Sequence, residues 1–291
     1  MSREIFEVRI VDNNSTDNTA QVVEGFTEPP LNAFYHRERN QGLSHARNLG
    51  WQVSRGRFVG YIDDECTLPA GWLSAAREIA NQINPEMFGG PYRPRYDVNR
   101  PVWFKDEYAN RSLGEKARFL DLEYLSGGNM FIRKDVFEDI GGFDPSLGMC
   151  GGRQAYGEET EFHERLRSRK PDARIYYDPG LMVSHLVRKE KLSVRHELRR
   201  RFITGREHVR SKFEKGLLPE AKSNERRRLL AEWMWQFKAL VKVFFQGMLR
   251  RDRVEYPFFH NFMYEVAGQK IETMGMLFEE SVQLGKKPHE A

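Results

Sequence analysis

The stretch RFVGYIDDE at residues 57–65 decides the fold of this chain. Residues 57–62 form an apolar, aromatic-rich run that predicts a central strand, and the run leads directly into Asp63, Asp64 and Glu65. Ligands in open α/β sheets bind outside the carboxyl ends of the strands. The sequence therefore predicts a ligand site where this strand ends.

Strand-like and helix-like segments alternate on both sides of this stretch, over residues 1–190. Strands are predicted at residues 8–11, 33–36, 129–132, 175–177 and 181–183. One helix is predicted after Thr16 or Asp17, either of which can cap it, and a second runs from Leu43 until Gly56 ends it. Two more helices are predicted over 70–83, with Pro69 in the first turn, and over 158–169. This alternation is typical of a layered α/β domain.

Residues 191–291 have a different character, because they are helical in pattern, rich in Arg and Lys, and without a strand signal. A break is predicted at residues 216–219, where Gly and Pro interrupt the pattern. Large apolar residues fill 233–248, with Arg250, Arg251 and Arg253 following. We expect this segment to be a helix packed on its own domain; the alternative is a helix at an anionic membrane surface.

The composition narrows the class of protein. The chain has 291 residues, of which 40% are hydrophobic and 12% aromatic, and this fits a packed globular core. The net charge of +4 is modest for this length, so we expect no nucleic-acid partner. Cys66 and Cys150 lie far apart without a CxxC pattern, which predicts small buried hydrophobes in a reducing compartment and neither a disulfide scaffold nor a zinc site.

The sequence carries no targeting signal that we can identify. The first residues, MSREIFEVRIVD, lack the apolar segment of a signal peptide. No apolar run approaches the roughly 20 residues that span a bilayer. We therefore expect a soluble cytoplasmic protein, with peripheral contact at the cytoplasmic membrane face as the option that the basic C-terminal helices leave open.

The acidic triplet has two interpretations from its chemistry alone. Adjacent carboxylates repel one another and need neutralisation. Because side chains alternate along a strand, Asp63 and Glu65 are expected on one side and Asp64 on the other. The triplet would then hold Mg²⁺ or Mn²⁺ against phosphate oxygens, or it would form an acidic turn that supports the dipole of the next helix.

The wider pattern resembles the family 2 glycosyltransferases, inverting enzymes of the GT-A fold. Five motifs occur in that family's order: VDNNSTDNT (11–19), NQGLSHARNLG (40–50), YIDDECTLPAGWL (61–73), GGNMFIRKDVFEDIGGFDPSL (127–147) and GEETEFHERL (157–166). The resemblance implies a mixed sheet flanked by helices over residues 1–190, with residues 191–291 as a helical extension. Members usually begin with an earlier strand and helix, so the chain would start at the second strand and leave a central strand position empty.

The resemblance also implies which residues hold a nucleotide-sugar. Asp12 would accept a hydrogen bond from the base, Arg47 would approach the base or diphosphate, and Asn40 and Gly42 would shape the loop before the helix. One carboxylate of the acidic triplet would bind the ribose and another the metal. The segment from Gly127 would border the sugar pocket. The implied nucleotide-sugar set is Asp12, Asn40, Gly42, Arg47, Asp63, Asp64, Gly128 and Asn129. Each also has an ordinary structural role: a turn, a surface charge or a bulge.

The metal and the catalytic base follow from the same resemblance. Asp64 and Glu65, with His185 after a short apolar strand, are the implied ligands of Mn²⁺ or Mg²⁺. Glu159 stands where the family has its base, with Glu158 as the reserve candidate. Two carboxylates in a first turn are also common complements to a helix dipole. A lone His such as His185 is more often a core or loop residue than a ligand.

The sequence thus predicts a metal-dependent glycosyltransferase in polysaccharide or glycoconjugate synthesis. It would move a sugar with inversion from a nucleoside-diphosphate sugar, UDP-sugar being favoured, to a saccharide or lipid-linked acceptor. Because the first strand is expected to be absent, a non-catalytic remnant that binds a nucleotide-sugar or glycan is the alternative. A nucleotidyltransferase is a further rival, and the absence of a Gly-rich, Lys-bearing phosphate loop near the first strand argues against it.

Overall fold

The computed structural model describes residues 6–25, 32–152, 155–214 and 224–284. The chain forms two compact units. The first comprises residues 1–95, 109–154 and 158–186, and the second comprises 96–108, 155–157 and 187–291. The sequence pattern gives no sign that the two short segments group with the second unit.

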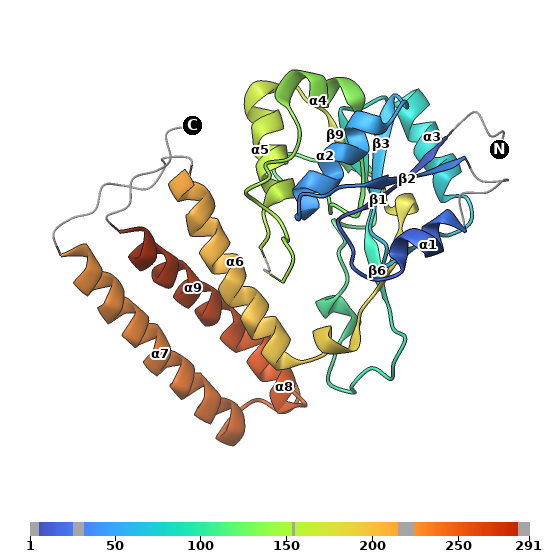
Figure 1. The fold of residues 1–291 in the computed structure, drawn as a ribbon. Coiled ribbons are helices and arrows are strands. Elements are labelled where there is room, and N and C mark those ends of the chain that lie inside the picture. The colour runs from blue at the N-terminus through green and yellow to red at the C-terminus, as the bar shows by residue number, and fades with distance from the viewer. Residues whose placement is uncertain (1–5, 26–31, 153–154, 215–223, 285–291) are drawn as a thin grey trace. The chain divides into compact units, whose positions relative to one another are not determined.

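The first unit is built from short strands and helices that alternate along the chain (Figure 1). Its strands are β1 (Val8–Asp12), β2 (Ala33–Arg37), β3 (Phe58–Ile62), β4 (Cys66–Thr67), β5 (Met87–Gly89), β6 (Tyr92–Arg95), β7 (Arg118–Phe119), β8 (Asn129–Arg133), β9 (Ile175–Tyr177) and β10 (Val183–Leu186). Its helices are α1 (Thr19–Glu24), α2 (Leu43–Val53), α3 (Trp72–Gln82), α4 (Lys134–Ile140), α5 (Glu158–Arg169) and the 3₁₀ turn η2 (Pro179–Leu181).

The main sheet is mixed, with strand order β3-β8-β5-β9-β7. Among the described residues β3 is an edge strand that pairs only with β8, so the prediction of a central strand at residues 57–62 was wrong about its place in the sheet. Strands β5 and β9 pair in parallel, while β3–β8, β5–β8 and β7–β9 pair antiparallel. Strand β10 pairs with β4 on one side and β6 on the other in a smaller sheet. This mixed arrangement, with helices packed on it, confirms the predicted α/β class.

The two faces of the main sheet carry separate apolar clusters, because side chains alternate along a strand. Met130 and Ile132 of β8 join the cluster that contains residues of α4 and α5. Phe131, between them, joins the cluster that contains Trp72 and Ile79 of α3. The sheet is therefore buried on both faces, between α3 on one side and α4 and α5 on the other.

Strands β1 and β2 form a parallel pair of their own. Helix α2 contacts both β1 and β3, and its Gly50 lies between the two strands. A Cβ atom at Gly50 would lie 3.8 Å from both Val11 of β1 and Tyr61 of β3. Within the described residues, β1 and β2 pair only with each other, and the predicted empty strand position stays a prediction.

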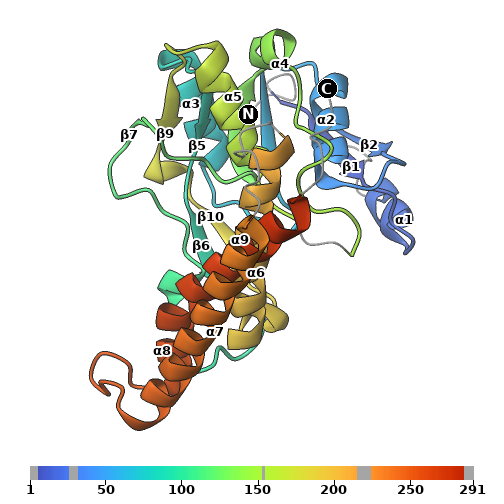
Figure 2. The same cartoon turned by 90° about the vertical axis from the view of Figure 1, so that its left-hand side faces the viewer.

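The second unit is helical in the part that the structure describes. It contains η1 (Asp106–Tyr108), η3 (Lys189–Lys191), α6 (Val194–Glu214), α7 (Glu225–Leu249), α8 (Phe259–Phe262), the π-helical turn η4 (Met263–Ala267) and α9 (Gly268–Gln283). Helix α9 packs against both α6 and α7 (Figures 1 and 2). Gly205 of α6 and Gly275 of α9 allow the close crossing, because a Cβ at either position would lie about 2 Å from a carbonyl oxygen of the other helix.

Several predicted boundaries differ from the structure for local reasons. Helix α3 begins at Trp72 after Gly71 in the left-handed conformation, so Pro69 lies before the helix rather than in its first turn. Asn18 is the residue before α1, although Asp17 does accept a hydrogen bond from the Thr19 backbone. Helix α2 ends at Val53, before Gly56.

Other predictions have mixed outcomes. Leu181 belongs to a 3₁₀ turn, and the last strand starts at Val183. Cys66 packs beside an apolar cluster, but Cys150 is exposed, so the prediction that both cysteines are buried was wrong. The predicted break at 216–219 lies outside the described residues. No helix in the described ranges is both long and apolar enough to cross a membrane.

We expect Asn48→Ala to destabilise the first unit by about 1–3 kcal/mol, because it removes two side-chain hydrogen bonds and leaves buried backbone groups without partners. Asn48 of α2 donates to the Phe143 carbonyl and accepts from the Phe143 amide, both at 2.8 Å. Urea unfolding should show the loss. The matched control is Gln52→Ala on the exposed side of the same helix, and an equal effect of both changes would contradict the role given to Asn48.

Candidate active site

Arg47 is the centre of the candidate site. Its side chain is only 6% exposed although it carries a permanent charge. The guanidinium donates a hydrogen bond from Nη1 to Glu158 Oε1 at 2.8 Å, and Nη2 lies 3.6 Å from Glu159 Oε1. A buried charge without partners would be strongly destabilising. Helices α2 and α5 are thus joined by one guanidinium and two carboxyl groups.

The two carboxyl groups on α5 have different surroundings. Glu158 is 4% exposed, and burial together with the nearby Glu159 raises the pKa of Glu158 to about 7. Glu159 is 27% exposed. Burial opposes ionisation of Glu159, but the charge of Arg47 and hydrogen bonds, including one with Glu158, together outweigh it and lower the pKa of that carboxyl. The pKa values of two neighbouring carboxyl groups commonly move apart in this way. Glu159 is therefore the ionised, accessible member of the pair near neutral pH.

Gly127 and Gly128 fit closely against this cluster. A Cβ atom at Gly127 would lie 2.3 Å from both Arg47 Nη2 and Glu159 Oε1. At Gly128 it would lie 2.2 Å from the carboxyl carbon of Asp63. Any larger residue at either position would displace the site's own side chains. The glycines thus make room for Arg47, Asp63 and Glu159, where the sequence suggested room for a substrate.

The acidic triplet lies at the end of β3, as predicted, but it turns instead of extending the strand. The Cys66 amide donates to the Asp63 carbonyl at 2.9 Å, which closes the turn. Strict alternation of the three side chains therefore does not apply. Burial raises the pKa of Asp63, against the opposing charges of Arg47 and His185. Asp64 is exposed.

Glu65 and His185 lie together, with His185 Nε2 3.6 Å from Glu65 Oε2. Both side chains are mostly buried, at 15% and 18% exposure. No group of three or more His, Cys, Asp or Glu residues suited to a metal ion occurs in the described part of the chain. Mg²⁺ and Mn²⁺ sites often use only one or two protein ligands, with phosphate and water completing the shell. A carboxylate beside an imidazole fits such a partial site.

Tyr92 and His163 support the site, and the sequence analysis missed both. The Tyr92 hydroxyl accepts from the Gly128 amide at 2.7 Å, and its ring stacks on His185 with centroids 5.1 Å apart. His163 Nε2 accepts from the Leu125 amide at 3.2 Å, so Nδ1 carries the proton and donates to the Glu159 carbonyl at 2.7 Å. Burial lowers the pKa of His163 to about 4, which keeps it neutral.

The predicted nucleotide residues near the N-terminus form a second group. Asp12 ends β1, and its carboxylate accepts from the Ser15 amide at 2.9 Å and from the Tyr35 hydroxyl at 2.7 Å. Despite burial, these hydrogen bonds lower the pKa of Asp12. Asn13 joins the two loops, because it accepts from the Gly42 amide and donates to the Asn40 carbonyl, both at 2.7 Å.

Asn129 has a structural position. Its side chain is fully buried, and its amide group donates to the carbonyls of Leu181 (2.7 Å) and Pro91 (3.3 Å). The side-chain oxygen has no hydrogen-bond partner among the described residues. Asn129 thus fixes the loops around β6 and β10 beside Gly128.

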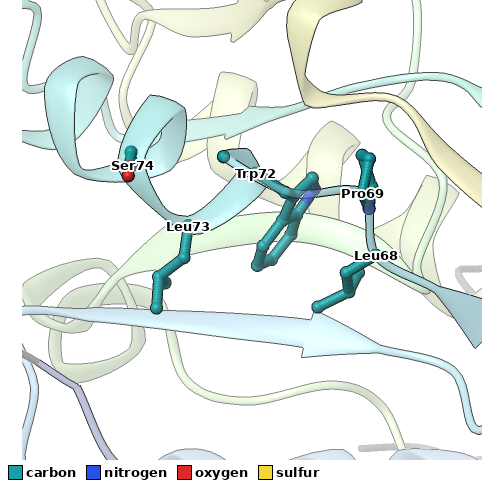
Figure 3. A pocket seen from close by; sticks show the side chains of 6 residues that line it. Leu68, Pro69, Trp72, Leu73 and Ser74 are labelled. Atoms are coloured by element: carbon teal, nitrogen blue, oxygen red, sulfur yellow. The ribbon is translucent and has the colours of Figure 1, made fainter. Parts of the chain in front are cut away.

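Two hollows of about 300 Å³ lie in the first unit. One, shown in Figure 3, is lined by residues 68–74 at the start of α3, where Leu68, Leu73 and Trp72 provide an apolar surface. The other has mainly polar walls next to Gly127, including Arg111, Ser126 and Tyr124. None of the predicted site residues lines either hollow, but the polar one borders the glycine segment.

In the structure, most of the predicted site residues therefore fall into two groups. Arg47, Asp63, Glu158 and Glu159 are joined around Gly127 and Gly128, with Glu65 and His185 beside them. Asp12, Asn40 and Gly42 lie around Asn13. The assignments to nucleotide, metal and proton transfer stay predictions. A sequence signal existed for His163, which lies one helical turn after Glu159, but none existed for Tyr92.

The family model described as Glycosyl transferase family 2 matches residues 2–141, which include the β3 strand and its acidic end. Residues 2–141 thus match glycosyltransferase family 2. Sequence relatives and solved structures agree with this placement, and the predicted family is confirmed.

Two curated relatives illustrate the range of the family. The glucosyl-dolichyl phosphate glucuronosyltransferase of Haloferax volcanii is 24% identical over 189 residues, covering 62% of this chain and 59% of the relative. The succinoglycan biosynthesis protein ExoM of Rhizobium meliloti is 28% identical over 212 residues, covering 72% of this chain and 65% of the relative. The chain thus spans less than two thirds of the length of these relatives.

Two solved structures share the fold. TarS 1-349 of S. aureus, in complex with UDP-GlcNAc, has a TM-score of 0.51 at 16% identity, over 97% of this chain and 84% of that one. GalNAc-T7 with UDP, GalNAc and Mn²⁺ has a TM-score of 0.50 at 16% identity, over 90% of this chain and 50% of that one. The predicted GT-A fold is therefore confirmed.

The raised pKa of Glu158 predicts a pH-dependent stability. Between the ordinary pKa of 4.5 and about 7, the folded chain holds a proton that the unfolded chain has lost. Rising pH through this window should therefore destabilise the wild type, on the order of 2 kcal/mol, relative to Glu158→Gln. Thermal unfolding between pH 4.5 and 8 measures the difference. Glu164→Gln, an exposed carboxyl on the same helix, should follow the wild type, and parallel curves for all three proteins would contradict the assignment.

Proposed function

We propose that this chain is a catalytic glycosyltransferase that moves a sugar, with inversion, from a nucleoside-diphosphate sugar to a hydroxyl acceptor. The observation that supports it is the arrangement of Arg47, Asp63 and Glu159 around Gly127 and Gly128. An ionised, accessible carboxylate stands there beside a buried cation, near the end of β3. The remnant alternative is not favoured, because this cluster is intact.

In the proposed reaction, the acceptor oxygen attacks the anomeric carbon from the side opposite the diphosphate. The bond between that carbon and the diphosphate oxygen breaks, and its electron pair leaves with the diphosphate. The acceptor proton passes to the Glu159 carboxylate, whose lowered pKa keeps it ionised at neutral pH. Arg47 orients Glu159, and neutral His163 holds the backbone of the same helical turn.

The donor and its metal would be held by separate residues. Asp12, Asn40, Gly42, Asp63 and Asp64 would bind the nucleoside, as the family resemblance implies. Glu65 and His185, with Asp64, would hold Mn²⁺ or Mg²⁺, which supplies positive charge to the leaving diphosphate. UDP is the nucleotide to test first, since the two solved structures of this fold are complexes with UDP or UDP-GlcNAc.

The acceptor would be a saccharide or a lipid-linked saccharide. The curated relatives include a transferase named for a dolichyl-phosphate sugar and a succinoglycan biosynthesis protein. The polar hollow bordered by Ser126, Arg111 and Tyr124 offers hydroxyl, guanidinium and phenol groups next to the glycine segment. Such groups suit the hydroxyls of a sugar ring, so we place the acceptor on this side.

Glu159→Gln should lower turnover about a hundredfold or more while leaving UDP affinity unchanged, because the amide cannot take the acceptor proton. Release of UDP from a panel of UDP-sugars, with a saccharide acceptor, measures turnover, and calorimetry measures UDP binding. Glu164→Gln on the same helix is the control. Wild-type turnover in the Glu159→Gln protein would refute the proposed base.

His185→Ala should weaken UDP binding about tenfold in Mn²⁺ but leave binding in a chelator unchanged, because only the metal-dependent part passes through the imidazole. Calorimetry with UDP under both conditions gives the comparison. His260→Ala, which removes an exposed imidazole in the second unit, is the control. An equal loss with and without Mn²⁺ would show a structural role for His185 instead.

A further inference from the structure

Helix α7 carries an apolar surface that its own unit does not cover. Its inward side packs through Leu229, Val243 and Gly247. A second row follows the helical spacing of three or four residues, and its members are between 40% and 61% exposed: Leu230, Met234, Phe237, Val241, Phe245 and Met248. We call this row the apolar stripe. The expectation that α7 packs on its own domain thus describes only one of its sides.

The exposed surface of α7 is larger than the stripe alone. Trp235 is 62% exposed and Leu249 is 78% exposed. Val254, in the loop after α7, is 91% exposed. Soluble monomers rarely expose so many adjacent large apolar side chains without a binding partner. The stripe therefore indicates a surface that something covers.

The charges beside the stripe identify the covering surface. Helix α7 contains five basic and two acidic residues. Both acids, Glu225 and Glu232, are ion-paired with Arg228. Arg226 and Arg227 stand at the start of the stripe, and Lys238 and Lys242 lie three residues before Val241 and Phe245, so they line its edge. In the described part of the chain these four cations form no ion pair.

We propose that α7 lies flat on an anionic lipid surface, with the apolar stripe in the acyl-headgroup boundary and the flanking cations on the headgroups. An amphipathic helix with aromatic residues on one face and Lys or Arg beside them suits this position. The long stems of Lys and Arg can lie along the apolar layer while their charges stay among headgroups. At about 37 Å, α7 is long enough to make an extended contact.

Two other arrangements are less consistent with these residues. A helix that crosses the bilayer is not found among the described helices. A second copy of the chain would cover the stripe, but it carries the same cations along its own stripe, so a contact of stripe on stripe would bring like charges together. Such like-charge contacts oppose association. Anionic lipid instead complements these cations.

The inference stands apart from the proposed function and is tested without measuring sugar transfer. The full chain should co-sediment with vesicles of phosphatidylcholine and phosphatidylglycerol at least about tenfold more strongly than with phosphatidylcholine alone, and high salt should reduce the binding. The double variant Phe237→Glu/Phe245→Glu should lose binding about tenfold or more. Both side chains are about half exposed, so thermal unfolding should match the wild type.

Two double variants that each remove two positive charges test whether the cations beside the stripe matter more than the net charge of the chain. Lys238→Gln/Lys242→Gln should weaken binding to the anionic vesicles, while Arg77→Gln/Lys116→Gln, which removes two exposed cations of the first unit, should not. Equal weakening by both pairs, or vesicle binding that survives Phe237→Glu/Phe245→Glu, would overturn the proposal. The proposal would also be overturned if the wild-type chain did not bind the vesicles but formed a dimer that Phe237→Glu/Phe245→Glu dissociates.

Discussion

The buried guanidinium of Arg47 is the interaction on which the candidate site depends. It reaches from α2 to Glu158 and Glu159 on α5, two segments that lie more than a hundred residues apart in the chain. Because Arg47 is almost fully buried, its charge has to be balanced locally, and the acids at the start of α5 provide that balance. The glycines at 127 and 128 complete the arrangement by leaving space for these side chains. Position, charge state and packing at the site are thus set together.

Much of the fold was predictable from the sequence, because its signals are local. The apolar run before Asp63 predicts β3, and the segment from Glu158 predicts α5 with the bounds that the structure shows. The family resemblance also implied one site for Arg47, Asp63 and Glu159, and their side chains lie together around Gly127 and Gly128. The strand and helix predictions succeeded because the periodicity of each element is carried by consecutive residues.

Features that depend on distant contacts were not predictable. Tyr92 belongs to the site only because β6 and β10 pair in parallel and bring its ring onto His185. The turn at Asp63 depends on one backbone hydrogen bond, and it replaces the alternation that a regular strand would impose. The exposed stripe on α7 could be recognised as apolar, but its unpacked side could be identified only once Leu229 and Val243 were seen to face the helical unit.

The crowding of acids at the end of β3 has a consequence for the order of events at the site. Asp63, Glu158 and Glu159 surround the guanidinium of Arg47, and Glu65 lies beside His185, whose imidazole is charged only when protonated. A diphosphate approaching this surface alone would meet net repulsion. Under the proposed function, positive charge would therefore have to arrive before the diphosphate or together with it. If the proposed donor binds here, its binding would follow an order in which the cation comes first and holds the anionic ligand in place.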